Sequence, residues 1–174
     1  MSIRQQLKAL EGLDPPRLWR FPSVGGNAKR RLFLGGQALT EYNDLNSASN
    51  FAVGRGVMVA QFTRWTRGDL VWRIGKRGGF LDSLHPPPEE VFELKIIGPT
   101  YHVRGIGVFA EANTLVVLRL HTRAYLDGKW EQEMLGALSD WDNLLPGISV
   151  FKGGSILDYV TENCDDFPLK FTRP

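Results

Sequence analysis

Cysteine and histidine are scarce in this sequence. Its single cysteine, Cys164, excludes an internal disulfide and a cysteine-rich zinc site. The three histidines do not have the spacing of metal ligands, so we expect no metal site and no cofactor. A lone thiol fits a reducing compartment, and we therefore expect a cytoplasmic protein.

Long apolar runs are also missing. No run is long enough to span a bilayer, and residues 1–16 lack the apolar core of a signal peptide, so we expect no contact with a membrane. The 174 residues include 43% hydrophobic and 23% charged side chains, which are ordinary values for a globular protein. This length supports one sizeable core, and we expect residues 1–174 to form a single domain.

Acidic charge is sparse in the first two thirds of the chain. Residues 1–126 hold 17 Lys/Arg and 10 Asp/Glu, whereas residues 127–174 hold 4 and 9, so the two parts carry +7 and −5. Residues 17–81 alone hold 11 basic and 3 acidic side chains. This asymmetry predicts a basic binding face with an acidic tail nearby, although chance clustering on a solvated surface explains it equally well.

The first half of the chain shows a mixed pattern of helices and strands. Apolar residues share one helix face in residues 2–13, and two prolines then end that helix. Residues 30–34 predict a short strand bounded by glycines, and residues 39–45 have helical spacing. Residues 52–75 fit either a helix or a strand, and of the two we favour a helix.

The most strand-like region follows. Three apolar runs separated by short turns, at about residues 90–97, 100–110 and 114–125, predict an antiparallel sheet. Helical spacing returns in residues 127–147, and a last short helix follows from residue 155. We therefore expect an α+β fold in which this sheet packs on helices, with an added C-terminal helical segment.

Arginine and histidine side chains interrupt the last two strands, and the turn between these strands decides where the cations lie. A two-residue turn, Ala112-Asn113, places Arg104 opposite His121. The other pairs on the same side are Ile106–Arg119 and His102–Arg123. The opposite side pairs Val103–Thr122, Gly105–Leu120, Gly107–Leu118 and Phe109–Val116. Because burying an unpaired guanidinium is costly, we expect the cationic side to face away from the hydrophobic interior.

A surface of this kind attracts anions, because arginine holds phosphate through parallel hydrogen bonds and histidine transfers protons near neutral pH. It suits RNA cleavage, in which a 2′-hydroxyl attacks the adjacent phosphate. We expect Arg104 and Arg123 to stabilise the phosphate. Proton transfer would fall to His121 or His102, and Tyr125 would position the substrate.

A structural role explains the same cations equally well. They can pair with Glu89, Glu90 or Glu93 on the preceding strand, or with the acidic tail. The acidic C-terminal third could then lie over the basic face. Under this alternative the chain is a non-enzymatic regulator that binds nucleic acid or protein, such as a phage- or island-encoded inhibitor.

Basic and aromatic residues also alternate in residues 54–79, a pattern that suits nucleic-acid binding through phosphate contacts and stacking. With two basic residues of the later strands, they give the candidate nucleic-acid contacts Lys95, Arg119, Arg64, Arg67, Arg73, Lys76 and Arg77. The alternative is that Trp65 and Trp72 belong to the core and the arginines cover them with their aliphatic stems.

The segments "FELKI", "YHVRGIGVF" and "LVVLRLHTRAY" resemble the second half of the RelE/HigB-like toxin superfamily. Members of that superfamily have a strand, two helices and then an antiparallel sheet. The resemblance covers about residues 30–126 and leaves a helical extension, 1–29, and an acidic extension, 127–174.

This resemblance implies cleavage of messenger RNA without a metal, often on the ribosome, and control by a paired antitoxin protein. It matches Arg104 with the arginine that contacts the scissile phosphate, and Lys95 with a basic residue that assists it. Arg123 and Tyr125 fall near the C-terminal catalytic positions.

Overall fold

A computed structural model describes residues 1–23, 28–44, 52–69, 80–84, 90–98 and 102–163, and these residues build one six-stranded sheet. The strand order is β1-β2-β6-β5-β4-β3. The strands are β1 Leu18–Arg20, β2 Arg31–Gly35, β3 Leu81–Ser83, β4 Val91–Ile97, β5 His102–Glu111 and β6 Thr114–Thr122. All neighbours are antiparallel except β2 and β6, which are parallel.

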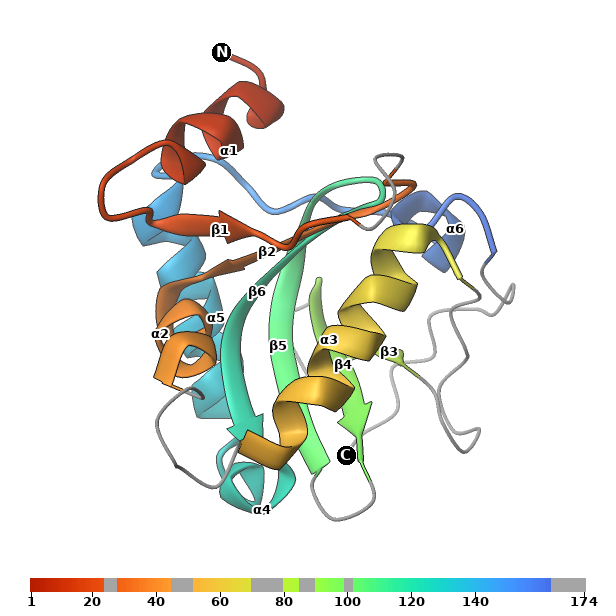
Figure 1. Cartoon of the computed structure of the whole chain (residues 1–174). Helices are drawn as coiled ribbons and strands as arrows, with labels where there is room; N and C mark the ends of the chain where they lie inside the picture. Colours follow the sequence, from red (N-terminus) through yellow and green to blue (C-terminus); the bar gives the residue numbers. More distant parts are fainter. Residues whose placement is uncertain (24–27, 45–51, 70–79, 85–89, 99–101, 164–174) are drawn as a thin grey trace.

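Helices cover both faces of this sheet (Figure 1). They are α1 Ile3–Glu11, α2 Gly36–Asp44, α3 Ala52–Arg67, α4 Arg123–Leu126, α5 Trp130–Leu144 and α6 Ile156–Tyr159. Side chains of α2, α3 and α6 share one core cluster with the sheet, and side chains of α1 and α5 share the other. The predicted α+β class is confirmed, but the expectation of a sheet with one uncovered face is wrong. None of the described helices is both long and apolar enough to cross a membrane.

Apart from α4, the helices form where apolar spacing predicts them. Ser2 and Gln5 make a reciprocal capping box at the start of α1, and Ser155 and Asp158 do the same for α6. The favoured helix in residues 52–75 is confirmed as far as Arg67, where α3 ends, and residues 70–75 lie outside the described residues. Helix α3 buries Phe62 and Trp65 almost completely. The edge strands β1 and β3 were not predicted, because three residues are too few to show an alternating pattern.

The β5–β6 hairpin has the predicted two-residue turn, in which Asn113 adopts a positive φ of 60°. At the end of the hairpin away from the turn, the residue pairs on both faces of the sheet also follow the prediction, and Arg104 lies opposite His121. Between these regions two compensating bulges shift the register by one. The structure pairs Gly107–Val117 and Phe109–Leu115, so the predicted pairs Gly107–Leu118 and Phe109–Val116 are wrong.

The first bulge explains why residue 107 is a glycine. A Cβ atom there would collide with the carbonyl oxygen of Val116 and lie 3.0 Å from the Cα atom of Val117. Both atoms belong to the backbone of β6, so they cannot move aside as a flexible side chain would. At Gly105, by contrast, the three atoms nearest to an added Cβ belong to side chains of β6 and β4, at 3.1–3.6 Å.

The substitution Gly107→Ala should lower the free energy of unfolding by about 1–3 kcal/mol, because the methyl group forces the two strands apart. The matched control is Gly56→Ala in α3, where no atom lies within 4 Å of the added Cβ. The control should raise stability by about 0.5–1 kcal/mol, as alanine does within a helix. Urea unfolding of both variants measures the difference, and a neutral Gly107→Ala would contradict the bulge.

Candidate functional site

Arg104 lies in the middle of the sheet and is buried against a carboxylate of the neighbouring strand. Its side chain is 10% exposed, and its Nε atom lies 2.5 Å from the Oε1 atom of Glu93 on β4. The Nζ atom of Lys95 lies 2.8 Å from Oδ2 of Asp82 on β3 and 3.9 Å from Oε2 of Glu93. Arg104 and Lys95 therefore already have anionic partners within the sheet.

Burial and charge act in opposite directions on this pair. Burial raises the pKa of Glu93, and the positive charges of Arg104 and Lys95 counteract that rise. Burial likewise lowers the pKa of Arg104, and the negative charge of Glu93 counteracts this shift. Each group thus favours the charged form of the other, as expected for a buried ion pair.

Helix α5 supplies the carboxylates that lie against Arg119 and His121. Arg119 places its Nε atom 2.8 Å from Oδ2 of Asp140 and donates a hydrogen bond of 3.1 Å to the carbonyl oxygen of Gly136. His121 places its Nε2 atom 2.8 Å from Oε2 of Glu133, whose side chain is 5% exposed. We call the set of Arg104, Arg119, His121, Glu93, Glu133 and Asp140 the ionic layer.

The ionic layer lies inside the molecule because α5 packs on this face of the sheet. The apolar residues of α5, which are Met134, Ala137, Trp141 and Leu144, share a core cluster with Ile106, Val108 and Leu118 of the sheet. Burying each large side chain contributes about 1.5–3 kcal/mol, so α5 is an integral part of the fold. The expectation that the cationic side faces away from the interior is therefore wrong. The structural alternative, pairing with Glu93 and the acidic tail, is what the structure shows.

Tyr125 and His121 are in contact, but the predicted catalytic residues Arg123 and His102 do not lie opposite each other as expected. The rings of Tyr125 and His121 stack with centroids 4.4 Å apart, and the Tyr125 hydroxyl lies 3.4 Å from Oε1 of Glu133. Residues 123–126 form α4 rather than the end of a strand, so the predicted pair His102–Arg123 is wrong. Arg123 forms an ion pair with Asp127, and His102 is exposed opposite Ile97.

The remaining candidate nucleic-acid contacts behave differently from one another. Arg64 lies 3.6 Å from Asp69, whereas Arg67 has no ion-pair partner among the described residues. Trp65 is a core residue that donates a hydrogen bond to the carbonyl oxygen of Arg31, as the core alternative predicted. The candidates Arg73, Lys76 and Arg77, and also Trp72, lie outside the described residues.

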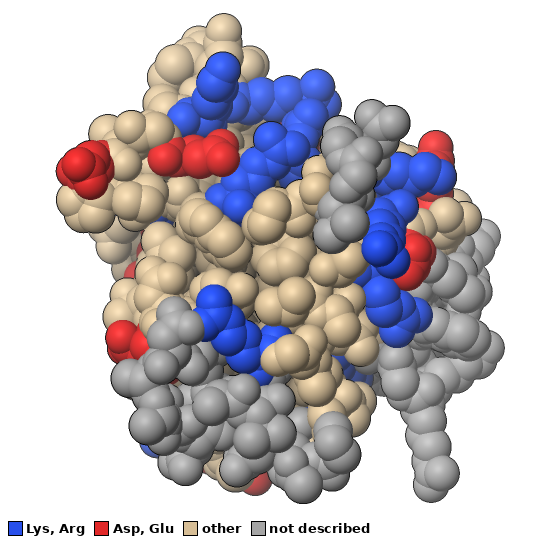
Figure 2. Space-filling view, viewed as in Figure 1, with Lys and Arg blue, Asp and Glu red and all other residues tan. Residues whose placement is uncertain are grey.

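An open group of cations that we did not predict lies between α1 and the edge of the sheet. It surrounds a cavity of about 540 Å³, here called the α1 groove, lined by Arg4, Leu7, Lys8, Glu11, Gly12, Arg20, Arg31 and Phe33. Figure 2 shows these basic residues as a band over α1 and β1–β2. One signal was available in the sequence, since positions 4, 8 and 11 share a helix face.

A buried ion pair predicts a large loss when one partner is removed. Arg104→Met should lower the free energy of unfolding at pH 7 by about 3–5 kcal/mol, because Glu93 is left buried with only the more distant Lys95 to offset its charge. The control Arg123→Met breaks an ion pair whose side chains are 45% and 70% exposed, and should cost less than about 1 kcal/mol. Equal losses in the two variants would contradict the buried pair.

The loss in Arg104→Met should also depend on pH. A carboxyl whose folded pKa is above its ordinary value binds its proton more tightly in the folded state, so stability falls as pH rises between those two values. The substitution removes a charge that lowers the pKa of Glu93, which widens this interval. The difference in the free energy of unfolding between wild type and Arg104→Met should therefore shrink as the pH falls from 7 towards the ordinary pKa of 4.5. Unfolding experiments across that pH range measure this difference.

The described residues contain no group of three or more His, Cys, Asp or Glu side chains that could hold a metal ion. Comparison with known proteins finds no relative of this chain. The chain matches no family model, no curated protein and no solved structure.

Proposed function

We propose that this chain binds nucleic acid without cleaving it. One contrast carries the proposal: the arginines and the histidine of the ionic layer lie against carboxylates, whereas Lys8 and Arg20 of the α1 groove have no ion-pair partner among the described residues. Proteins that contact phosphates with exposed Lys and Arg bind nucleic acid largely independently of base sequence. The geometry thus favours binding over catalysis.

The distribution of exposed charge supports this proposal. Figure 2 shows basic residues in several groups on one face, among them the α1 groove and a second group near the C-terminal end of α3. The second group includes Arg64 and Arg67 in the last turn of α3, and Lys29 beside Gly68. Two separate contacts of this kind would let one strand of nucleic acid cross the face between them.

Binding to a single-stranded RNA should be strong at low salt and weaken steeply as salt increases. The logarithm of the association constant should fall by about 0.7 per phosphate contact for each unit of log salt. Fluorescence anisotropy with a labelled oligonucleotide between about 50 and 200 mM salt measures the slope. Electrophoresis of the same RNA after incubation should show no cleavage. Absence of binding at the lowest salt would contradict the proposal.

A second candidate is RNA cleavage of the RelE/HigB-like kind, with the ribosome and an antitoxin protein as its partners. The order of β2, α2, α3 and the antiparallel strands β3–β6 supports it, because it is the order that the resemblance implied. The position of Arg104 opposite His121 supports it as well. Catalysis of this kind would require α5 to move, since its Glu133 and Asp140 lie against His121 and Arg119.

This second candidate makes a distinct prediction in cells. Expression of the chain alone should arrest growth, and Arg104→Ala should relieve the arrest while the variant remains folded by circular dichroism. The more conservative Arg104→Lys keeps the charge and should give partial relief, because lysine does not hold phosphate bidentately. Normal growth on expression of the wild-type chain would rule this candidate out.

A further inference from the structure

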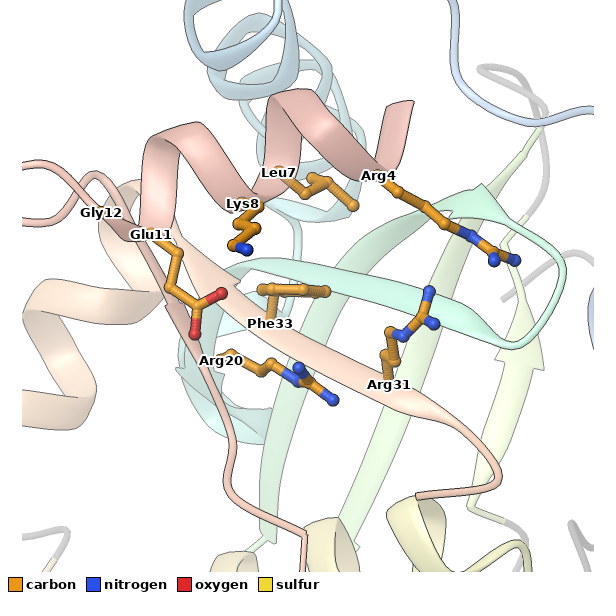
Figure 3. A pocket seen from close by; sticks show the side chains of 8 residues that line it. All are labelled: Arg4, Leu7, Lys8, Glu11, Gly12, Arg20, Arg31 and Phe33. Atoms are coloured by element: carbon orange, nitrogen blue, oxygen red, sulfur yellow. The ribbon is translucent and has the colours of Figure 1, made fainter. Parts of the chain in front are cut away.

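The α1 groove is a built cavity rather than a flat patch. Helix α1 is held to the sheet by Leu7, which is 2% exposed, and Phe33 of β2 forms the apolar floor at 4% exposed. Figure 3 shows Arg4 and Arg31 towards one end of the groove, and Lys8, Glu11 and Arg20 towards the other, with Phe33 between them. Its volume of about 540 Å³ is within the range of cavities that bind small ligands.

The charge of the groove is only partly neutralised by the protein itself. Four cations and one carboxylate, Glu11, line the cavity, so its lining carries a net charge of +3. Glu111 at one end offsets one further charge, since its Oε1 atom lies 2.7 Å from Arg4 and 3.0 Å from Arg31. Lys8 and Arg20 have no ion-pair partner among the described residues.

This imbalance distinguishes the groove from the ionic layer. In the ionic layer each cation lies against a carboxylate, so an incoming anion finds no positive charge unmatched. In the groove, Lys8 and Arg20 lie on two different elements and face one concave space above an apolar floor. A concave site with low-dielectric walls focuses the field of such charges onto a bound anion.

We infer that the α1 groove is a phosphate-binding site that takes the phosphodiester backbone of a single nucleic-acid strand. The inference rests on the proposed function and names the place where that function is carried out. Two observations favour a single strand over a duplex. The cavity is small, and cations line it from both the helix side and the sheet side. Free polyphosphate has the same chemistry, so the test must separate the two sources.

The variant Lys8→Gln/Arg20→Gln tests the inference without disturbing the fold, because neither side chain takes part in an ion pair among the described residues. Its matched control is Lys129→Gln/Lys152→Gln, which removes the same charge from two exposed positions in the C-terminal third of the chain. A third variant, Glu11→Gln, removes the carboxylate that lines the groove and should act in the opposite direction. The probes are a fluorescein-labelled single-stranded RNA, measured by anisotropy, and inorganic tripolyphosphate, measured by its effect on Tm.

The groove variant should weaken RNA binding about tenfold and reduce the salt slope by about 1.4, which is about 0.7 for each lost phosphate contact. The control should stay within about twofold of wild type, and Glu11→Gln should bind more tightly. RNA binding that the control variant loses and the groove variant keeps would overturn the groove while leaving the proposed function intact. If wild type ignores RNA but tripolyphosphate raises its Tm and not that of the groove variant, the groove binds free phosphate groups only, and both the nucleic-acid strand as its ligand and the proposed function fail.

Discussion

The arrangement of this protein depends on matching two buried or partly buried arginines and one histidine with carboxylates in one layer. Arg104 is held by Glu93 within the sheet, while Arg119 and His121 are held by Asp140 and Glu133 from α5. An isolated guanidinium in this position would be too costly to bury, and the acidic residues remove that cost. The apolar side chains of α5 then close over the same face.

Closure by α5 determines where an external anion can bind. The middle of the sheet is occupied on both faces, so its cations serve the fold rather than a ligand. Towards the β1 edge, in the part of the chain that the structure describes, α1 leaves a cavity lined by Lys8 and Arg20, which have no ion-pair partner there. Helix α5 of the acidic C-terminal third thus contributes two of the carboxylates of the ionic layer, while Lys8 and Arg20 near the N-terminus have no ion-pair partner among the described residues.

Local pattern was a good guide to the elements and a poor guide to their environment. The hairpin turn, the opposition of Arg104 and His121, and the capped helices follow from neighbouring residues, and these predictions are confirmed. The surroundings of Arg119 do not follow from neighbouring residues, because its partner Asp140 lies 21 positions away and no local sequence rule connects the two. We assumed that the side of the β5–β6 hairpin that carries the basic residues must be exposed. This assumption did not consider that another element, α5, could supply carboxylates to that side.

Hydrogen–deuterium exchange of the full chain, with and without single-stranded RNA, tests the central claim most directly. Amide protons of α5 should exchange nearly as slowly as those of β5 in both conditions, because α5 is part of the core. Added RNA should slow exchange in α1 and β1 and leave β5 and β6 unchanged. Rapid exchange throughout α5, or protection by RNA centred on β5 and β6, would show that the ionic layer is an open surface and would contradict this account.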